Sequence, residues 1–427
     1  MFRARKSFFP YSVHSPQSSV PAAERPPVGL LSAVVIVASL GYFVDIYDLI
    51  LFSIVRVKSL TALGVTDVKT EGEFLLQVQM GGMLLGGILW GVLGDKRGRL
   101  SVLFGSILLY SLANLANAFV HTLGQYAWLR LVAGVGLAGE LGAGITLVSE
   151  SLPRERRGLG TMLVATVGVS GAMLAFWVGE QFGWRTAYGV GGVLGLALLV
   201  LRVSVFESGM FRRTQESAAA RGNFLALFTH GPRLRRYLRC LLIGVPLWFV
   251  VGILITFAPE FGRALGLTGP VEAGRAVFWC YFGLVFGDFA SGALSQLLRS
   301  RKRALQVFLG LCTAVVLAYL FALRGATPEG FYRMCFVVGL AVGFWALFVT
   351  VAAEQFGTNL RATVATTAPN FARGSVVALV PAFRWAEAHL GGSLPGAAAL
   401  GLLTLAVALW AVSTLPESFG KDLDYVE

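Results

Sequence analysis

The chain has 427 residues, of which 56% are apolar and only 14% are charged. Soluble proteins carry charge on about a quarter of their residues, so this composition argues against a soluble multidomain enzyme, a disordered scaffold or a secreted disulfide protein. The 35 Lys and Arg exceed the 23 Asp and Glu, giving a net charge of +12. These cations lie in short clusters between apolar runs and not on one face that could bind nucleic acid.

Apolar runs of about 20 residues recur along the chain, and a helix of that length crosses the hydrocarbon core of a membrane. The first run is too long for a cleaved signal peptide, so we expect it to be a retained helix. The pattern predicts an all-α membrane protein with twelve transmembrane helices. The predicted spans are 29–55, 73–94, 101–121, 124–150, 158–180, 186–205, 238–262, 274–298, 304–323, 330–355, 362–386 and 394–415.

The spans fall into two groups of six, because the only long break lies in the middle of the chain. The resulting parts are an N-terminal tail 1–28, an N-terminal bundle 29–205, a linker 206–237, a C-terminal bundle 238–415 and a C-terminal tail 416–427.

Most Lys and Arg outside the spans lie on the side of the termini. The positive-inside rule therefore predicts a multi-pass protein of the plasma membrane, the inner membrane in a bacterium, with both termini and the linker in the cytoplasm. The linker also carries an apolar patch, which predicts a short helix lying on the anionic inner leaflet. The patch consists of Phe224, Leu225, Leu227 and Phe228.

The two halves repeat each other at an offset near 203 residues. The run GVLGDKRGR at 91–99 returns in decayed form at 292–303, and RLVAGVG at 130–136 returns as RMCFVVG at 333–339. The separation from Glu150 to Arg157 equals that from Glu354 to Arg361. Two repeats in the same orientation are typical of secondary transporters, whose substrate site lies at the midplane between the halves.

These motifs resemble the major facilitator superfamily. Residues 91–99 resemble its loop between helices 2 and 3, 150–158 resemble its E-x-x-P-x-x-x-R-G signature, and 416–420 resemble its P-E-T-x-G ending with Ser418 in place of Thr. The glycine-rich helix 4 is matched by Arg130, Gly134, Gly136 and Gly139. The likeness is to the metabolite–proton symporter and organic-ion branches. It implies two pseudo-symmetric six-helix bundles that transport by alternating access, and we expect a monomer.

Four ionisable residues fall at or near the middle of predicted spans, namely Asp45, Asp48 one turn further out, Asp288 and Arg373. Each charge at the centre of a membrane helix costs roughly 2.5–3.5 kcal/mol. We therefore expect these residues to face a water-filled cavity and to compensate one another. Thr363, Thr366, Asn370 and Arg373 also form one polar stripe at helical spacing. Packing between helices is the alternative role of such a stripe.

The chemistry of these residues suggests their roles. Arg373 offers a planar fork of donors that matches a carboxylate, and the resemblance places it at the charge-selecting position of the organic-ion branch, which favours an organic anion. Alternatively, Arg373 only neutralises Asp45 or Asp288. The three aspartates are the candidate proton carriers. The remaining residues expected to bind substrate are Asn370, Tyr47, Trp248, Phe344 and Trp345, of which Trp248 occupies the repeat position of Asp45.

Charges near the cytoplasmic ends of the spans are candidates for a gate that pairs in one state and separates in another. A plain positive-inside cluster is the alternative interpretation. The candidates are Asp95, Arg99, Glu150, Arg157, Glu354 and Arg361, together with Arg130 and Glu140 deeper on helix 4.

The sequence favours a proton-coupled symporter of a small organic anion that lies in a lipid bilayer. A proton-coupled exporter of organic cations or drugs is the alternative, and a membrane sensor is a third class. An enzyme is not expected. The histidines form no group that could bind a metal or activate a nucleophile, and the sequence has no phosphate-binding loop. No cofactor or metal is predicted, and the cysteines are read as inert thiols. The histidines are His14, His121, His230 and His389, and the cysteines are Cys240, Cys280, Cys312 and Cys335.

Overall fold

The computed structural model describes residues 32–97, 99–140, 144, 148, 152, 157–207, 224 and 226–420. Within this part the chain is α-helical and has no β-strand. The helices before the central break are α1 (Ala33–Ala62), α2 (Val68–Arg97), α3 (Arg99–Asn117), α4 (Leu123–Leu137), α6 (Arg157–Val169), α7 (Gly171–Gln181) and α8 (Gly183–Glu207).

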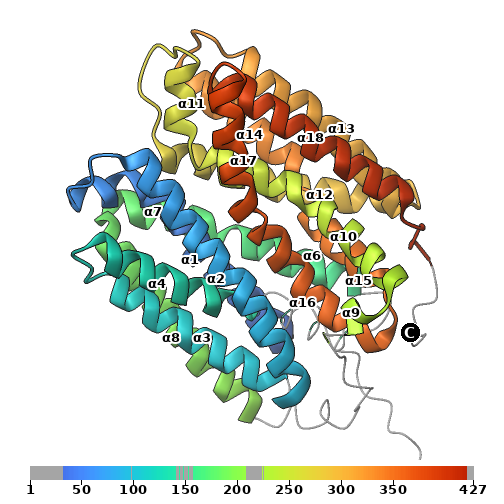
Figure 1. Ribbon diagram of the computed structural model, residues 1–427. Coiled ribbons are helices and arrows are strands. Elements are labelled where there is room, and N and C mark those ends of the chain that lie inside the picture. Colours follow the sequence, from blue (N-terminus) through green and yellow to red (C-terminus); the bar gives the residue numbers. More distant parts are fainter. Residues whose placement is uncertain are drawn as a thin grey trace, which may run out of the picture.

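The second half begins with a short helix and then runs through six further spans. Its helices are α9 (Ala226–Thr229), α10 (Gly231–Phe249), η2 (Val250–Ile255), α11 (Ala258–Ala264), α12 (Ala273–Leu297), α13 (Arg301–Phe321), α14 (Pro328–Val342), α15 (Trp345–Glu354), α16 (Thr358–Gly374), α17 (Val376–His389) and α18 (Ser393–Thr414). In Figure 1 most of the blue and green helices gather on one side and the yellow to red helices on the other.

Local sequence explains where several helices begin. Thr122 starts α4 with a capping box, in which its hydroxyl accepts from the backbone N–H of Gln125 while the Gln125 side chain accepts from the Thr122 backbone. Ser300 and Thr327 cap α13 and α14 in the same way with their hydroxyls. Each cap satisfies an N–H group that the helix itself leaves unpaired.

Nine helical stretches in the described part are long and apolar enough to cross a membrane. The three remaining predicted spans correspond to the shorter α3, to α4 beyond which the chain is only partly described, and to α16 with α17. The last of these was predicted as one helix, but it bends where Ser375 separates α16 from α17. The predicted span 330–355 is likewise broken at Gly343 and Phe344, between α14 and α15.

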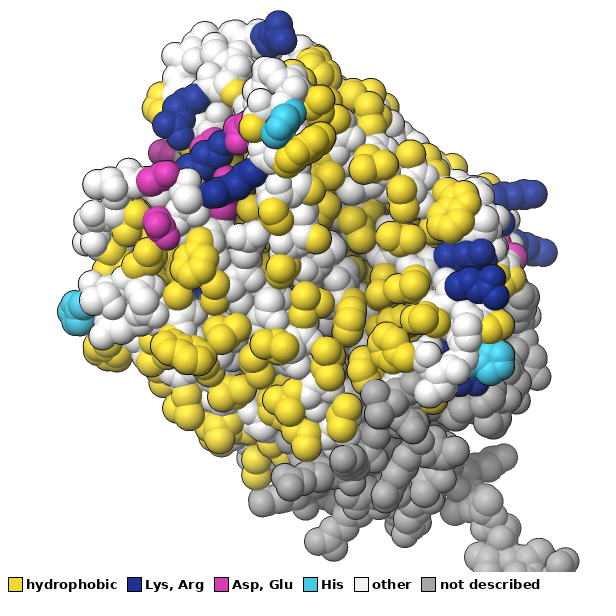
Figure 2. Space-filling view, viewed as in Figure 1, with side chains coloured by type: hydrophobic (Ala, Val, Ile, Leu, Met, Phe, Trp, Pro, Cys, Tyr) yellow, Lys and Arg dark blue, Asp and Glu magenta, His cyan; other side chains and the backbone are white. Residues whose placement is uncertain are grey.

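The surface has the pattern of a membrane protein. Figure 2 shows apolar side chains over the middle of the molecule and charged side chains gathered towards two opposite ends. One end mixes Lys and Arg with Asp and Glu, whereas the other shows mainly Lys and Arg. Large apolar residues such as Leu85, Trp128 and Leu403 are more than half exposed, which is the expected state of side chains that face lipid.

The predicted position of the linker patch is wrong in part. Phe224 and Leu227 are buried, and the Phe224 ring lies 6.4 Å from the ring of Phe371 on α16. Phe228, which is partly exposed, contacts both Phe224 and Tyr237. Two of the patch residues therefore pack against the bundle and are not free to face a leaflet, whereas the expected short helix is present as α9. Leu225 lies outside the described residues.

Helices α1 and η2 meet across the two halves at equivalent positions of the repeat. The hydroxyl of Thr256 donates to the hydroxyl of Ser53 over 3.0 Å, and the two residues are 203 positions apart. The predicted offset of the internal repeat is thus seen as a pseudo-twofold contact in the structure.

Candidate functional site

The centre of the molecule holds a buried ion pair between the halves. Arg373 lies in the last turn of α16, and both of its terminal nitrogens lie 3.5 Å from Asp45 Oδ2 on α1. Neither side chain is exposed. A charge-assisted bond between these groups normally measures about 2.7–2.9 Å, so Arg373 and Asp45 are close but loosely paired.

Aromatic side chains enclose this guanidinium. Arg373 lies over the rings of Trp248 and Trp345, at 5.9 and 5.6 Å from their centroids. The two indoles meet edge to face at 6.1 Å, and Phe348 packs against Trp345 at 5.2 Å. The break before α15 positions Trp345, because Phe344 departs from helical geometry and the chain resumes a helix at Trp345. Asp45 and Trp248, which occupy equivalent positions of the repeat, both lie beside Arg373.

Asp288 on α12 contacts the same helix break. Its Oδ1 accepts from the backbone N–H of Ala346 over 3.1 Å, so this carboxylate satisfies one of the N–H groups exposed at the start of α15. Its Oδ2 is buried and has no hydrogen-bond partner among the described residues. Tyr42 of α1 also belongs to this region, since its hydroxyl interacts with Trp345 and lies within electrostatic reach of Arg373, Asp45 and Asp288.

Several buried polar atoms around Arg373 have no hydrogen-bond partner in the described part of the chain. The unpaired donors are Arg373 Nε and Trp248 Nε1, and the unpaired acceptors are Asp45 Oδ1, Asp288 Oδ2 and Asn370 Oδ1. Buried polar groups are normally paired, so a cluster of unpaired ones calls for a ligand. The site therefore offers donors to an acceptor-rich anion and acceptors to protons.

The structure places Asn370 and Phe344 beside the central site, but it uses the hydroxyl of Tyr47 elsewhere. Asn370 Nδ2 donates to the Ala138 carbonyl over 2.6 Å, which joins α16 to the end of α4 across the halves. Phe344 is buried at the break before α15. Tyr47, in contrast, donates its hydroxyl to the Ala187 carbonyl over 2.8 Å, so its polar group is used within the N-terminal half.

Asp48 and Arg130 occupy a second buried region, inside the N-terminal half. Arg130 donates to the Gln79 side chain and lies over the rings of Phe52 and Tyr188 at 5.1 and 5.6 Å. Asp48 is within electrostatic reach of Arg130 and Asp45. Neither oxygen of Asp48 has a hydrogen-bond partner among the described residues.

The central charges were expected to face a water-filled cavity, but in this structure they are closed off from solvent. Asp45, Asp48 and Arg373 have no solvent exposure, and Asp288 has 2%. The aromatic side chains of α10 and α15 close over the guanidinium and exclude water. The structure thus has the central charges in a closed site.

The end of the molecule at which α1 ends and α2 begins, here named the α1–α2 end, is held shut by ion pairs between the halves. Arg56 of α1 is fully buried and donates to both oxygens of Glu260 over 2.8 and 2.9 Å. Lys69 pairs with Glu387 over 2.8 Å. Arg384 of α17 pairs with Glu73 of α2. Three charge pairs therefore close the α1–α2 end, which the sequence analysis did not identify as a gate.

The predicted gate at the other end is only partly covered by the structure. Glu150 and the side chains of Asp95, Arg99 and Arg157 lie outside the described residues. Glu354, expected to act with Arg361, instead pairs with Arg301 over 3.4 Å and accepts from Ser418 Oγ over 2.7 Å. The second contact comes from Ser418 in the C-terminal tail. The tail lies outside the internal repeat, so comparing the two repeats could not reveal this contact.

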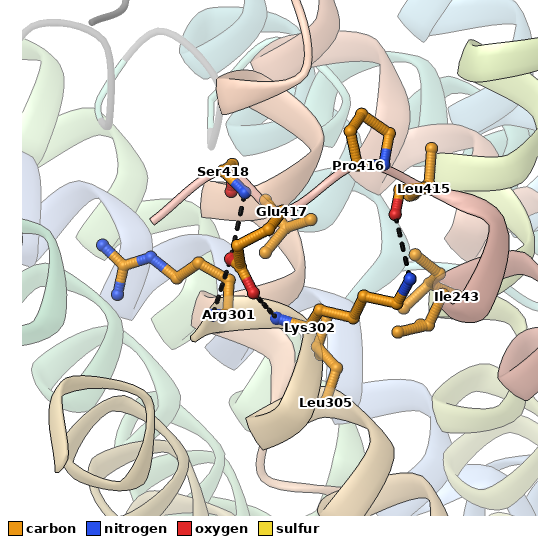
Figure 3. Close-up of a pocket in the computed structure, with 10 residues that line it drawn as sticks. Ile243, Arg301, Lys302, Leu305, Leu415, Pro416, Glu417 and Ser418 are labelled. Atoms are coloured by element: carbon orange, nitrogen blue, oxygen red, sulfur yellow. Dashed lines mark hydrogen bonds between the residues drawn. The ribbon is translucent and has the colours of Figure 1, made fainter. Parts of the chain in front are cut away.

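The same tail is fastened to the start of α13 (Figure 3). Glu417 accepts from the backbone N–H groups of Arg301 over 2.9 Å and Lys302 over 3.3 Å, and from the Ser300 hydroxyl. Burial raises the pKa of Glu417, but the hydrogen bonds from Ser300 and from backbone N–H groups outweigh burial and hold the pKa below its ordinary value. Glu417 therefore remains a carboxylate that caps α13.

Sequence reasoning missed several residues that the structure places in buried ion pairs or around Arg373. Arg202 of α8 forms a buried ion pair with Glu140, although a lone Arg inside an apolar run could have been found by the rule that identified Asp45. Tyr42 and Phe348 carry no signal, because aromatic residues are common in membrane helices. Glu260 carries none either, since it lies at the end of the predicted span 238–262, where a charge near the membrane surface is ordinary.

Two bundles related by a repeat, with a charged and aromatic site between them, define a secondary transporter. The family model described as "Major Facilitator Superfamily" matches residues 38–381, and the chain belongs to this family. It is a transporter family and not one of enzymes.

Among curated proteins, the chain is similar to a "Probable 4-methylmuconolactone transporter" of Cupriavidus pinatubonensis, with 26% identity over 90% of each protein. It is 31% identical to the "3-(3-hydroxy-phenyl)propionate transporter" of Escherichia coli, over 67% of this chain and 70% of that protein. Among solved structures, the proton:xylose symporter XylE bound to 6-bromo-6-deoxy-D-glucose has a TM-score of 0.66 and 17% identity, with coverage of 92% of this chain and 97% of that chain.

Proposed function

We propose that this protein transports a small organic anion together with protons by alternating access. The observation that carries the proposal is the set of unpaired donors at Arg373 Nε and Trp248 Nε1, in a fully buried site between the halves. A carboxylate offers only acceptors, so it would complete both donors at once. A cation would instead meet the guanidinium of Arg373 and be repelled.

The substrate class follows from the walls of the site. Two indoles and Phe348 surround the guanidinium, so an unsaturated or aromatic carboxylate would stack on the rings while its carboxylate binds Arg373. The names of the two relatives, a muconolactone transporter and a hydroxyphenylpropionate transporter, agree with this class. Asn370 and Phe344 are proposed to complete the binding surface.

Asp45, Asp48 and Asp288 are the proposed proton carriers. Asp45 already shares Arg373, so an anion that occupies the guanidinium would weaken the Asp45–Arg373 pair and favour protonation of Asp45. Binding of the anion and of the proton would then be cooperative, as symport requires. The printed title of the XylE structure names a proton symporter, which agrees with this coupling in a protein of the same fold.

The arrangement in the membrane is also a proposal. We place the N-terminal bundle at 29–205 and the C-terminal bundle at 238–415, joined by a cytoplasmic linker, in the plasma membrane. Both termini lie in the cytoplasm, and the protein acts as a monomer. The mainly basic end in Figure 2 agrees with a cytoplasmic side. The charges near the cytoplasmic ends of the spans and the α1–α2 end then gate the two sides alternately.

The test is a ligand screen on purified protein. We expect aromatic carboxylates to raise the melting temperature of the wild type, because a ligand that binds only the folded state stabilises it. Arg373→Ala should lose this stabilisation, while Arg324→Ala, at an exposed arginine, should retain it. Uptake of the best ligand into proteoliposomes should require an inward proton gradient.

Two results would contradict the proposal. Stabilisation by organic cations that persists in Arg373→Ala would place the binding site at the aspartates and indicate export of cations. Accumulation of the anion against its gradient by variants in which all three aspartates are replaced by Asn would remove them from proton coupling.

A further inference from the structure

Six polar atoms on one face of α3 are buried and have no hydrogen-bond partner in the described part of the chain. Four residues at helical spacing form this surface, here named the α3 polar face. Native proteins pair the great majority of their buried polar groups, so this concentration on a single helix needs an explanation. The atoms are Tyr110 Oη, Ser111 Oγ, and both the Nδ2 and Oδ1 of Asn114 and Asn117.

Two residues of the α3 polar face, Tyr110 and Asn114, lie near Asp48. The Asn114 side chain faces the Asp48 carboxylate, although no hydrogen bond of normal geometry joins them. A Cβ atom at Gly191 of α8 would lie 2.1 Å from Asp48 Oδ1, and one at Gly195 would lie 2.0 Å from Ser111 Oγ. Glycine at both positions thus lets the carboxylate and the hydroxyl lie against the backbone of α8.

The other groups around Asp48 leave its carboxylate unpaired. Asp45 and Arg130 are its charged neighbours, and Tyr47, Tyr110 and Tyr188 also lie within its electrostatic reach. The Tyr47 hydroxyl is bonded to a backbone carbonyl, and the Tyr188 hydroxyl is bonded to Tyr126. Arg130 donates to Gln79 through Nη2 alone, and its Nε and Nη1 are buried without a partner among the described residues.

This arrangement favours a bound ligand, because buried carboxyl and amide groups without hydrogen-bond partners are costly whether or not the carboxyl group is ionised. A small hydrogen-bonding ligand would satisfy the carboxylate and the amides together. Buried water has this property, since each molecule makes about three hydrogen bonds to otherwise unsatisfied groups. Asn and Ser side chains both donate and accept, so they can hold water in either orientation.

We propose that the α3 polar face binds water that carries protons to and from Asp48, inside the N-terminal half and apart from the anion site at Arg373. This inference rests on the proposed function. Each transfer breaks an O–H bond of a protonated water and forms one at an Asp48 oxygen, and release reverses it. Asn114 and Asn117 act as positioning residues for the water. Asn117 ends α3 and is itself buried, so the path is shut towards the α1–α2 end in this state.

The test replaces Asn114 by leucine, which has a similar volume and no polar atom. In proteoliposomes with a pH gradient, Asn114→Leu should lower the initial rate of anion uptake and of the accompanying proton uptake by about tenfold, a loss of about 1.4 kcal/mol in the barrier. Counterflow exchange of labelled anion should stay within about twofold of wild type, because the anion site is untouched. Asn114→Ser should restore proton-driven uptake.

Thr313→Val is the matched control, since it removes a hydroxyl that bonds only within its own helix in the C-terminal half. It should leave both rates unchanged. Should Asn114→Leu fail to fold, Asn117→Leu supplies the same comparison.

The opposing interpretation is that the α3 polar face is only a packing defect. Leucine would then remove unpaired groups, raise the melting temperature and leave proton uptake unchanged, and that result would overturn the inference. Uptake that stops when Na⁺ is replaced by choline would also overturn it, because the face would then hold Na⁺. If wild type concentrates no organic anion under any gradient, the proposed function itself fails.

Discussion

Glu140 and Arg202 show how a single pair of residues can be fixed by the packing around it. Both side chains are almost fully buried, and Arg202 Nη1 donates to Glu140 Oε2 over 2.9 Å. A Cβ atom at Gly41 of α1 would lie 1.9 Å from Arg202 Nη2, so only glycine leaves room for the pair. Because both charges belong to the N-terminal half, the pair ties the segment that follows α4 to α8, and a gating role for Glu140 stays a prediction.

Removal of one charge from this pair should destabilise the protein strongly. Glu140→Gln leaves the Arg202 guanidinium buried without its counter-charge, and such a loss costs about 3–5 kcal/mol. We expect a clear fall in the melting temperature in detergent. The double variant Glu140→Leu with Arg202→Met should recover most of the loss, because an apolar pair of similar volume needs no charge. Equal melting temperatures for Glu140→Gln and wild type would contradict this account.

At the scale of elements, the helix ends carry much of the function. Arg373 stands in the last turn of α16 before the bend at Ser375, and Trp345 begins α15 after the break at Phe344. Breaks of this kind leave backbone groups without partners, which is tolerated in a membrane only where protein covers them. Here Asp288 supplies one of the partners, so the break and the anion site are one structural unit.

The contact between the tail and α13 should depend on pH. The pKa of Glu417 is below its ordinary value. The contact therefore contributes stability at neutral pH and loses it at acidic pH, as the pH falls through this lowered pKa and the carboxylate takes up a proton. Hydrogen exchange at the amides of Arg301 and Lys302, corrected for its intrinsic pH dependence, should become faster there.

Glu417→Gln should show the fast exchange already at pH 7, and Glu329→Gln, at the start of α14, should not. Slow exchange in Glu417→Gln at pH 7 would show that the carboxylate does not hold this end of α13.

At the scale of the whole molecule, the two halves meet tightly at the α1–α2 end. Three ion pairs and the bond between Ser53 and Thr256 lie across the halves. A transporter that alternates between two states must break these contacts to open that end. The structure therefore corresponds to a state in which this end is closed.

A disulfide at the pseudo-symmetric contact should lock this state. The hydroxyls of Ser53 and Thr256 are 3.0 Å apart, so cysteines at both positions are close enough to be oxidised together. We expect the double variant to lose transport on oxidation and to regain it with a reductant, while substrate binding measured by thermal shift persists. Each single cysteine variant is the control. Full transport by the cross-linked protein would contradict a closed α1–α2 end.

Much of this organisation could be predicted from the sequence. The twelve spans follow from hydropathy, because a lipid environment allows little else than apolar helices. Asp45, Asp288 and Arg373 stood out because a charge in hydrocarbon is expensive. The repeat offset even paired Asp45 with Trp248, and both meet at Arg373 in the structure.

Other features depend on which helices become neighbours, and the sequence by itself did not determine them. The pairing of Glu354 with Arg301, the burial of Phe224 and the partners of Glu140 and Arg56 all join residues far apart in the chain. Hydropathy indicates that a residue lies in the membrane. It does not indicate the direction in which the side chain points relative to distant helices. Only tertiary packing brings the donors of Arg373 and Trp248 into one dry site, because their geometry depends on two helix breaks and on the contact between the halves.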